Sequence, residues 1–152
     1  MRLRFRIIAL AFLTLLLPAC SDQACYDDTD PLVNVSFFES GTGAVLKSDS
    51  VRVMGLLPQS PTELLKLRNV SGFQLPLNPA ADTAVVVIIL NGVADTATIS
   101  YNSFVHFVSP ECGYTFYNTI TGLNTTHYII DSLIIENNNI TVDGERNLRL
   151  FY

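Results

Sequence analysis

The sequence is poor in the residue types that most often carry chemistry at a protein surface. It contains no tryptophan, two histidines and three cysteines among 152 residues. Sites that bind sugars stack them on exposed aromatic rings, usually including tryptophan, so its absence argues against a typical glycan-binding surface. The spacings His-x-His, His-Glu-x-x-His and Cys-x-x-Cys do not occur. The sequence therefore supports no transition-metal site.

Positive charge is scarce as well. Nine Lys and Arg residues stand against 14 Asp and Glu residues. Three of the nine, Arg2, Arg4 and Arg6, precede residue 20, so the rest of the chain carries six basic and 14 acidic residues, a net charge of −8. An acidic surface repels phosphate groups. The composition therefore argues against nucleic acid and against anionic membrane surfaces as partners.

The common catalytic motifs are missing too. No Gly-x-Ser-x-Gly, phosphate-binding loop or Gly-x-Gly-x-x-Gly occurs. His106 lies in a strand-like segment, and we expect it to be a packing residue that lies far from His127. We predict one of the two on a strand and the other near the start of a strand. With no convergent titratable groups in view, the sequence predicts a protein that is not an enzyme and needs no cofactor.

The first 19 residues have the parts of a secretory signal. After the three arginines comes an apolar run from Ile7 to Leu17, broken only by Thr14. A basic start, a short apolar stretch and a small residue before the cleavage point are typical of such signals. The run is about half of the roughly 20 residues that a spanning helix needs. A buried helix is the alternative, but the run has no polar face. We predict a signal peptide over residues 1–19.

The segment that ends this run, Leu17-Pro18-Ala19-Cys20, resembles the motif at which bacterial lipoproteins are cut and acylated. Pro18 is an uncommon residue in that motif. The resemblance implies that Cys20 becomes the first residue of the mature protein and carries the lipid. Two or three acyl chains anchor a protein stably. We therefore expect the membrane as a partner through a lipid anchor, in the outer membrane, with the domain facing the periplasm or the cell surface.

The two remaining cysteines, Cys25 and Cys112, form an even pair in an oxidising compartment. We predict a disulfide between them, with Cα atoms about 5–6 Å apart. Two free thiols are the alternative.

Residues 20–31 are polar and acidic, and we interpret them as a tether ahead of one domain over residues 32–152. Asp27, Asp28 and Asp30 could ligate Ca²⁺, but the segment lacks the glycine and the distal glutamate of a calcium loop. We interpret them as solvated linker and predict no metal site.

From residue 32 onward the chain is strand-like, with Gly, Asn, Pro and Asp between the segments. This pattern predicts an all-β fold, an antiparallel immunoglobulin-like β-sandwich of about seven to nine strands, with a small closed barrel as the alternative. Residues 61–67 could hold one helical turn. We expect most of the Phe and Tyr rings to be core residues or cross-strand pairs. The segments expected as strands are 32–40, 48–56, 64–70, 73–77, 83–90, 93–101, 104–108, 114–121, 128–136, 140–142 and 148–152.

Asn91-Gly92, between two β-rich segments, predicts a two-residue hairpin turn. That register pairs Leu90 with Val93 and Ala84 with Ile99, and it assigns this face to the core. The opposite face carries Val85, Val87 and Ile89, an apolar row beside two threonines. We consider this row a candidate docking surface, with coverage by other parts of the chain as the alternative.

Three short phrases resemble a small Bacteroidota lipoprotein family known only as a domain of unknown function. They are Ala24-Cys25 with its acidic residues, Leu75-Pro76-Leu77-Asn78, and the segment 107–114 that holds Cys112. The resemblance implies no catalytic residues, and it implies an outer-membrane β-barrel protein as a partner. It also implies O-glycosylation at Asp-Ser or Asp-Thr followed by a small or aliphatic residue, which this chain has at Thr96, Ser50, Thr83 and Ser132.

These observations favour a non-catalytic envelope lipoprotein whose β-sandwich serves as a binding or assembly module for another envelope protein. The alternative is a glycan- or small-ligand-binding module on the cell surface. That alternative requires a concave site lined with exposed aromatic rings.

Overall fold

A computed structural model describes residues 24–56 and 61–152. In this part of the chain all regular structure is β, and there is no helix that could cross a membrane. Cys20 and the signal segment 1–19 lie outside the described residues. The strands are β1 (Leu32–Phe38), β2 (Val51–Leu56), β3 (Pro61–Leu67), β4 (Gly72–Pro76), β5 (Thr83–Leu90), β6 (Val93–Ser109), β7 (Gly113–Thr125), β8 (Ser132–Ile135), β9 (Asn139–Ile140) and β10 (Leu148–Phe151).

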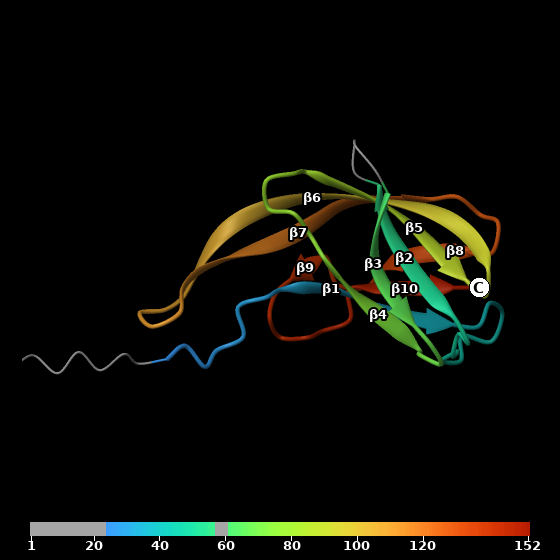
Figure 1. Ribbon diagram of the computed structural model, residues 1–152, viewed down its shortest axis with the longest axis horizontal. Helices are drawn as coiled ribbons and strands as arrows, with labels where there is room; N and C mark the ends of the chain where they lie inside the picture. Colours follow the sequence, from blue (N-terminus) through green and yellow to red (C-terminus); the bar gives the residue numbers. More distant parts are fainter. Residues whose placement is uncertain (1–23, 57–60) are drawn as a thin grey trace, which may run out of the picture.

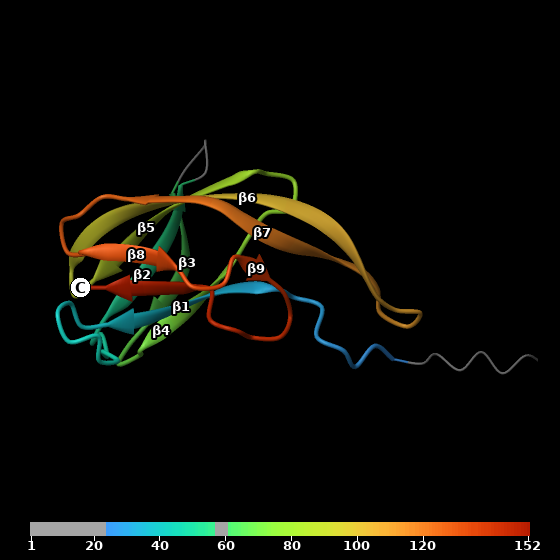
Figure 2. The same cartoon turned by 180° about the vertical axis from the view of Figure 1, so that it is seen from behind.

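The strands form two sheets that face each other, as Figures 1 and 2 show. One sheet has the order β4-β1-β10-β8, and the other has the order β3-β2-β5-β6-β7-β9. All neighbours are antiparallel except β1 and β10, which run parallel. The all-β sandwich is therefore confirmed. The closed barrel is not observed, because β4, β8, β3 and β9 are sheet edges.

The core lies between the two sheets because alternate residues of each strand point inward. Val33, Val35 and Phe37 of β1 face Val51 and Val53 of β2, and all five are buried. Burying one such side chain contributes about 1.5–3 kcal/mol. The strands therefore pack by the period-two pattern that the sequence shows.

The β5–β6 hairpin has the predicted turn and register. Asn91 and Gly92 both have positive φ, 51° and 91°. Asn and Gly are the residues that adopt these angles most readily in a two-residue turn. Leu90 pairs with Val93 and Ala84 with Ile99, which confirms the expected pairing.

The absence of a side chain at Gly72 allows the edge strand β4 to approach β1. A Cβ atom placed on Gly72 would lie 2.2 Å from the carbonyl oxygen of Val35. Any other residue would push β4 away from its partner. Gly72 therefore permits the pairing that fixes this edge of the smaller sheet.

Four expectations about strand boundaries are wrong. Residues 61–67 form strand β3, with no helical turn, because their alternating leucines pair with β2. The segments 93–101 and 104–108 are one strand, β6, of 17 residues. The polar residues 102–103 suggested a break between two strands. The strand continues through them with a register irregularity between Ser100 and Tyr101, and a hydrogen bond of 2.7 Å joins Ser103 to Asn118 on β7.

The third correction concerns residues 128–136, of which only Ser132–Ile135 form a strand. The backbone N–H groups of Tyr128, Ile129 and Ile130 donate to the carboxylate of Asp95 at 2.8–2.9 Å. These groups are therefore not available to a β-ladder. The fourth concerns the expected strand 140–142, of which only Ile140 lies in a strand, β9 (Asn139–Ile140).

Candidate functional site

Strands β6 and β7 extend well beyond the sandwich. Their pairing continues to Ser109 and Gly113, whereas the opposing sheet consists of strands of four to seven residues. In Figure 1 the hairpin projects to one side of the molecule, with no strand of the smaller sheet beneath its end. We call residues 104–117 the arm. The arm is the part of the sheet that the other layer does not cover.

The arm exposes large apolar side chains. Those with more than two fifths of their surface exposed are Phe104 (49%), Val105 (59%), Phe107 (51%), Tyr114 (71%) and Phe116 (44%). Exposed apolar side chains occur singly or in pairs elsewhere in the described residues, but five of them gather within these 14 positions, which marks an uncovered apolar surface.

Two cross-strand pairs form the inner face of the arm. Val105 lies opposite Phe116, and Phe107 lies opposite Tyr114 with ring centroids 5.2 Å apart. These residues continue the row of Ser103 and Asn118, which faces the core. The inner face is therefore an extension of the core-facing side of the sheet without a second layer on it.

The outer face of the arm holds one of the two histidines. His106 stacks on Tyr117 with ring centroids 4.0 Å apart and planes inclined by 11°, and Phe104 meets the same tyrosine edge-on at 6.3 Å. This arrangement fits the packing role that the sequence suggested for His106.

The chain ahead of β1 is joined to the end of the arm. The structure joins Cys25 and Cys112 in a disulfide with Cα atoms 4.8 Å apart, slightly below the expected 5–6 Å and inside the usual range. Thr115 Oγ1 donates to the carbonyl oxygen of Thr29 at 2.6 Å. In Figures 1 and 2 the chain from β1 runs back along the arm. The acidic tether is thus fixed to the arm at two points.

A cavity of about 470 Å³ opens where the arm leaves the sandwich, and we call it the root cavity. Three segments far apart in the sequence form its walls, and prolines contribute to two of them. A proline ring fixes the backbone angle φ, so these walls are largely preformed. The lining residues are Thr29, Asp30, Pro31, Leu32, Pro76, Leu77, Pro79, Thr115, Phe116 and Asn118.

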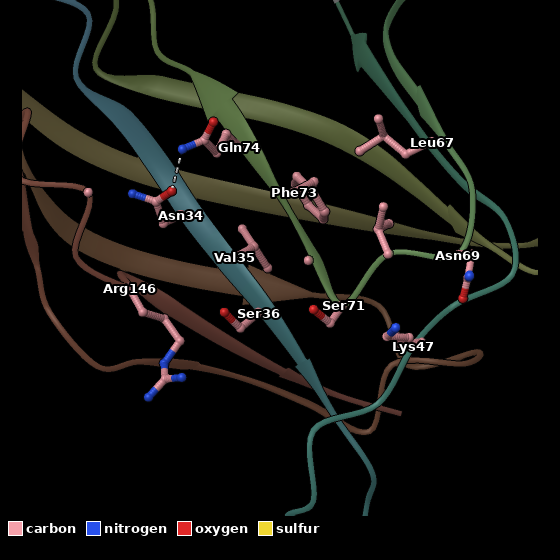
Figure 3. Close-up of a pocket in the computed structure, with 13 residues that line it drawn as sticks. Asn34, Val35, Ser36, Lys47, Leu67, Asn69, Ser71, Phe73, Gln74 and Arg146 are labelled. Atoms are coloured by element: carbon pink, nitrogen blue, oxygen red, sulfur yellow. Dashed lines mark hydrogen bonds between the residues drawn. The ribbon is translucent and has the colours of Figure 1, made fainter. Parts of the chain in front are cut away.

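A second hollow, of about 630 Å³, is more open and lies over β1 and β4 (Figure 3). Polar side chains line much of it, and Gln74 Nε2 donates to Asn34 Oδ1 at 2.8 Å. Lys47 and Arg146 lie at its margins, and its one aromatic residue, Phe73, is buried. This hollow therefore lacks the exposed ring on which a sugar would stack.

The other histidine lies at the opposite end of β6. His127 follows β7, with Nδ1 3.0 Å from the carbonyl oxygen of Ile130, in the loop that Asp95 holds. Asp95 and His106 are separated by about 35 Å of strand at about 3.3 Å per residue. The two histidines lie apart, as expected, although His127 precedes β8 by several residues.

Among the residues that the structure describes, Asp95 is the one acidic residue that is buried. It also accepts a hydrogen bond from Thr126 Oγ1. Burial by itself would raise the pKa of Asp95, but the hydrogen bonds from Thr126, Ile129, Ile130 and Tyr128 outweigh it and lower the pKa. All of its acceptor capacity serves the loop, so Asp95 is a structural residue.

The candidate docking row on the outer face of β5 is half-buried. Val85, Val87 and Ile89 are partly covered by neighbours on β2 and β6, with Arg52 opposite Ile89 and Met54 opposite Val87. The arm exposes more apolar surface than this row does. We therefore place the candidate site at the arm and the root cavity.

The acidic tether residues gather no ion-binding geometry. Asp28 Oδ1 accepts a hydrogen bond from the backbone N–H of Asp30 at 3.1 Å. Within residues 24–56 and 61–152, no three His, Cys, Asp or Glu side chains lie close enough together to hold a metal ion. Of the candidate glycosylation residues, Thr83 is exposed, and Ser50, Thr96 and Ser132 are half-buried.

Comparison with known proteins gives one match. No curated protein and no solved structure matches the chain. The model of a family described as a family of unknown function (DUF6452) matches residues 50–152, which include β2 to β10, the arm and Cys112. The chain belongs to this family of unknown function, DUF6452.

Proposed function

We propose that the chain is a non-catalytic lipoprotein of the cell envelope that binds another envelope protein through the root cavity. The observation that carries this proposal is the preformed apolar cavity beside the arm. It has the size of an ordinary ligand site, roughly 300–1,000 Å³. Its walls combine Leu32, Leu77 and Phe116 with rigid prolines. Such a cavity fits one or two large apolar side chains from a partner.

The charge of the chain indicates the chemistry of that partner. Asp30 lies on the cavity wall, and the chain beyond residue 19 carries a net charge of −8. A partner segment with an apolar anchor and flanking Lys or Arg residues would be attracted to this surface. We therefore expect a basic envelope protein, and an outer-membrane β-barrel protein with such a loop is the partner that we propose.

The surroundings of the titratable groups support a non-catalytic role. His106 is stacked on Tyr117, and His127 bonds to its own loop at the other end of the sheet. A general base needs to lie within hydrogen-bond reach of a reacting group that a second residue also contacts. Neither histidine lines the root cavity or the hollow over β1 and β4.

The glycan-binding alternative has less support. The root cavity contains one exposed aromatic residue, Phe116, and the hollow over β1 and β4 contains none. Carbohydrate sites usually present a ring platform together with several polar groups. An apolar, proline-walled cavity suits a hydrophobic side chain better than a sugar.

The anchor and the cavity can be tested separately. A Cys20→Ala variant should leave the membrane fraction or remain unprocessed. A variant that still fractionates and migrates like the parent contradicts the lipoprotein assignment. For the cavity, a photoreactive amino acid at Pro79, on the rim, should crosslink one discrete envelope protein in living cells. The same probe at Lys66, an exposed position on β3, serves as the control.

Two matched substitutions sharpen the cavity test. Phe116→Arg should abolish the crosslink from position 79, whereas Phe104→Arg should preserve it. The two phenylalanines have similar exposure on the arm, 44% and 49%, but only Phe116 lines the cavity. Equal loss with both variants contradicts the cavity as the binding site. A bound glycan in the native mass spectrum, with no protein crosslink, contradicts the proposal in favour of the alternative.

A further inference from the structure

We infer that the arm lies in the interfacial layer of the lipid bilayer, with the aromatic rings near its end among the headgroups. The inference rests on the proposed lipid anchor at Cys20. It goes beyond that anchor because it assigns a second, non-covalent membrane contact to the folded domain. The side chains concerned are Val105, Phe107 and Tyr114, together with Tyr26 of the tether.

Covalent distances bring the arm to the membrane. Cys20 and Cys25 are five positions apart, a span of at most about 18 Å even when fully extended. The disulfide then places the Cα atom of Cys112 4.8 Å from that of Cys25. If acyl chains hold Cys20 at the surface, the end of the arm stays within about 25 Å of it in every conformation of the tether.

The side chains within this distance suit the interface. Phe107 and Tyr114 are half or more exposed, and Tyr26, next to the disulfide, is 90% exposed. Tyrosine is enriched at the headgroup level of membranes, where the ring is buried and the hydroxyl stays hydrated. A soluble domain with these rings in water would carry an aggregation-prone patch. At the bilayer surface the same patch contributes to binding.

Acidic groups set the depth and the lipid preference. Glu111 lies in the turn at the end of the arm, and Asp27 and Asp28 follow Cys25 closely on the tether. Carboxylates do not enter the hydrocarbon layer, so the arm lies along the surface and does not insert end-first. Like charges repel, so a zwitterionic surface should be favoured over an anionic one.

The lack of tryptophan provides a clean reporter. We would purify the lipidated chain from envelopes as Phe107→Trp and incorporate it into phosphatidylcholine vesicles. The expected result is a blue-shifted emission maximum and strong quenching by brominated acyl chains. The matched control is Val93→Trp, at the other end of β6, which is similarly exposed at 42% and should remain unshifted and unquenched. Phosphatidylglycerol in the vesicles should reduce the quenching of the Phe107→Trp variant.

The strength of the contact is measured without the anchor. In a Cys20→Ser background, replacing Phe107 or Tyr114 by Ser should weaken partitioning into phosphatidylcholine vesicles by about tenfold each, or about 1.4 kcal/mol. A Val93→Ser control should change nothing.

The outcomes separate the two proposals. If the chain is absent from membranes, the lipid anchor is overturned. The partitioning of the Cys20→Ser chain into vesicles then decides whether the arm binds lipid. An anchored chain in which Phe107→Trp is no more quenched than Val93→Trp overturns this inference alone. A third outcome is that the tryptophan of Phe107→Trp is not quenched in pure vesicles but is covered by a bound protein in native envelopes. That outcome also overturns the inference and assigns the arm to a protein partner.

Discussion

The two halves of the β6–β7 hairpin share one strand pair and one alternation of residues, yet they have opposite surroundings. In the half next to the β5–β6 turn, the inward residues Ala97, Ile99 and Ile120 are at most 3% exposed. In the arm, Val105 and Phe107 occupy the same side of the same sheet and are more than half exposed. The difference arises because the smaller sheet ends before the arm begins.

This contrast shows that alternation of apolar and polar residues specifies a strand with one apolar face. It does not specify which part of the protein covers that face. Period-two alternation is a property of the strand itself. Coverage depends on the length of strands in another layer, which are formed by residues elsewhere in the chain. Three experiments test whether the two halves differ in this way.

The largest effect is expected from truncating matched side chains in the two halves. Ile99→Ala leaves a cavity in a packed core and should lower the free energy of unfolding by about 2–5 kcal/mol. Val105→Ala removes an exposed side chain and should change it by less than about 0.5 kcal/mol. Urea unfolding of the two variants measures the difference. Similar losses would show that the arm is packed in solution.

The second test concerns the buried carboxylate at the start of β6. Asp95→Asn removes a charged acceptor from four hydrogen bonds and should cost about 2–4 kcal/mol at neutral pH. The pKa of folded Asp95 is lowered from its ordinary value near 3.8. Its contribution is therefore complete above that value and is lost as the pH falls below about 4 towards the folded-state pKa.

The measurement is urea unfolding of the parent and of Asp95→Asn across acidic pH. The difference between them should narrow as the solution is acidified. Asp49→Asn, an exposed aspartate, serves as the control and should show no such narrowing. A difference that stays constant through acid would mean that the hydrogen bonds do not depend on the charge of Asp95.

The smallest effect is expected from removing the disulfide with Cys25→Ser and Cys112→Ser together. A loop of this length could contribute about 4–5 kcal/mol if both ends were otherwise fixed. Here the reduced folded state would also regain freedom, because only a short tether separates Cys25 from β1. The net loss should be about 2 kcal/mol.

Hydrogen exchange would show where that loss falls. Amides of the arm should exchange faster in the double variant, while those around Ile99 and Ile120 remain protected. If the core amides lose as much protection as the arm, the two halves unfold as one unit and the contrast between them does not extend to dynamics.

Much of the larger sheet is predictable because its signals are local. Asn91-Gly92 sets both the turn and the register, and the period-two pattern assigns Val86 and Ile88 to the core. The extension of β6 through Asn102 and Ser103 is not local, because a bond between Ser103 and Asn118 supports it. The parallel pairing of β1 with β10 also has no local signal.

The candidate site is less predictable for the same reason. The arm contains the aromatic residues that the sequence assigned to the core or to cross-strand pairs, and Phe107 with Tyr114 is such a pair. The pair is exposed because the strands of the smaller sheet are too short to cover the arm. The root cavity brings together residues 29–32, 76–79 and 115–118. No pattern within any one of these segments indicates the other two.

The parallel β1–β10 pair has a consequence for how this chain folds as it is made. Asn34 and Asn147, which bond across this region, are 113 positions apart. A chain that emerges in the order of its synthesis presents β1 long before β10. Until then β1 has β4 as a neighbour and one open edge, which can pair with another chain. A chain shortened before Leu148 therefore keeps that edge open, and we expect it to aggregate more readily than the full-length chain.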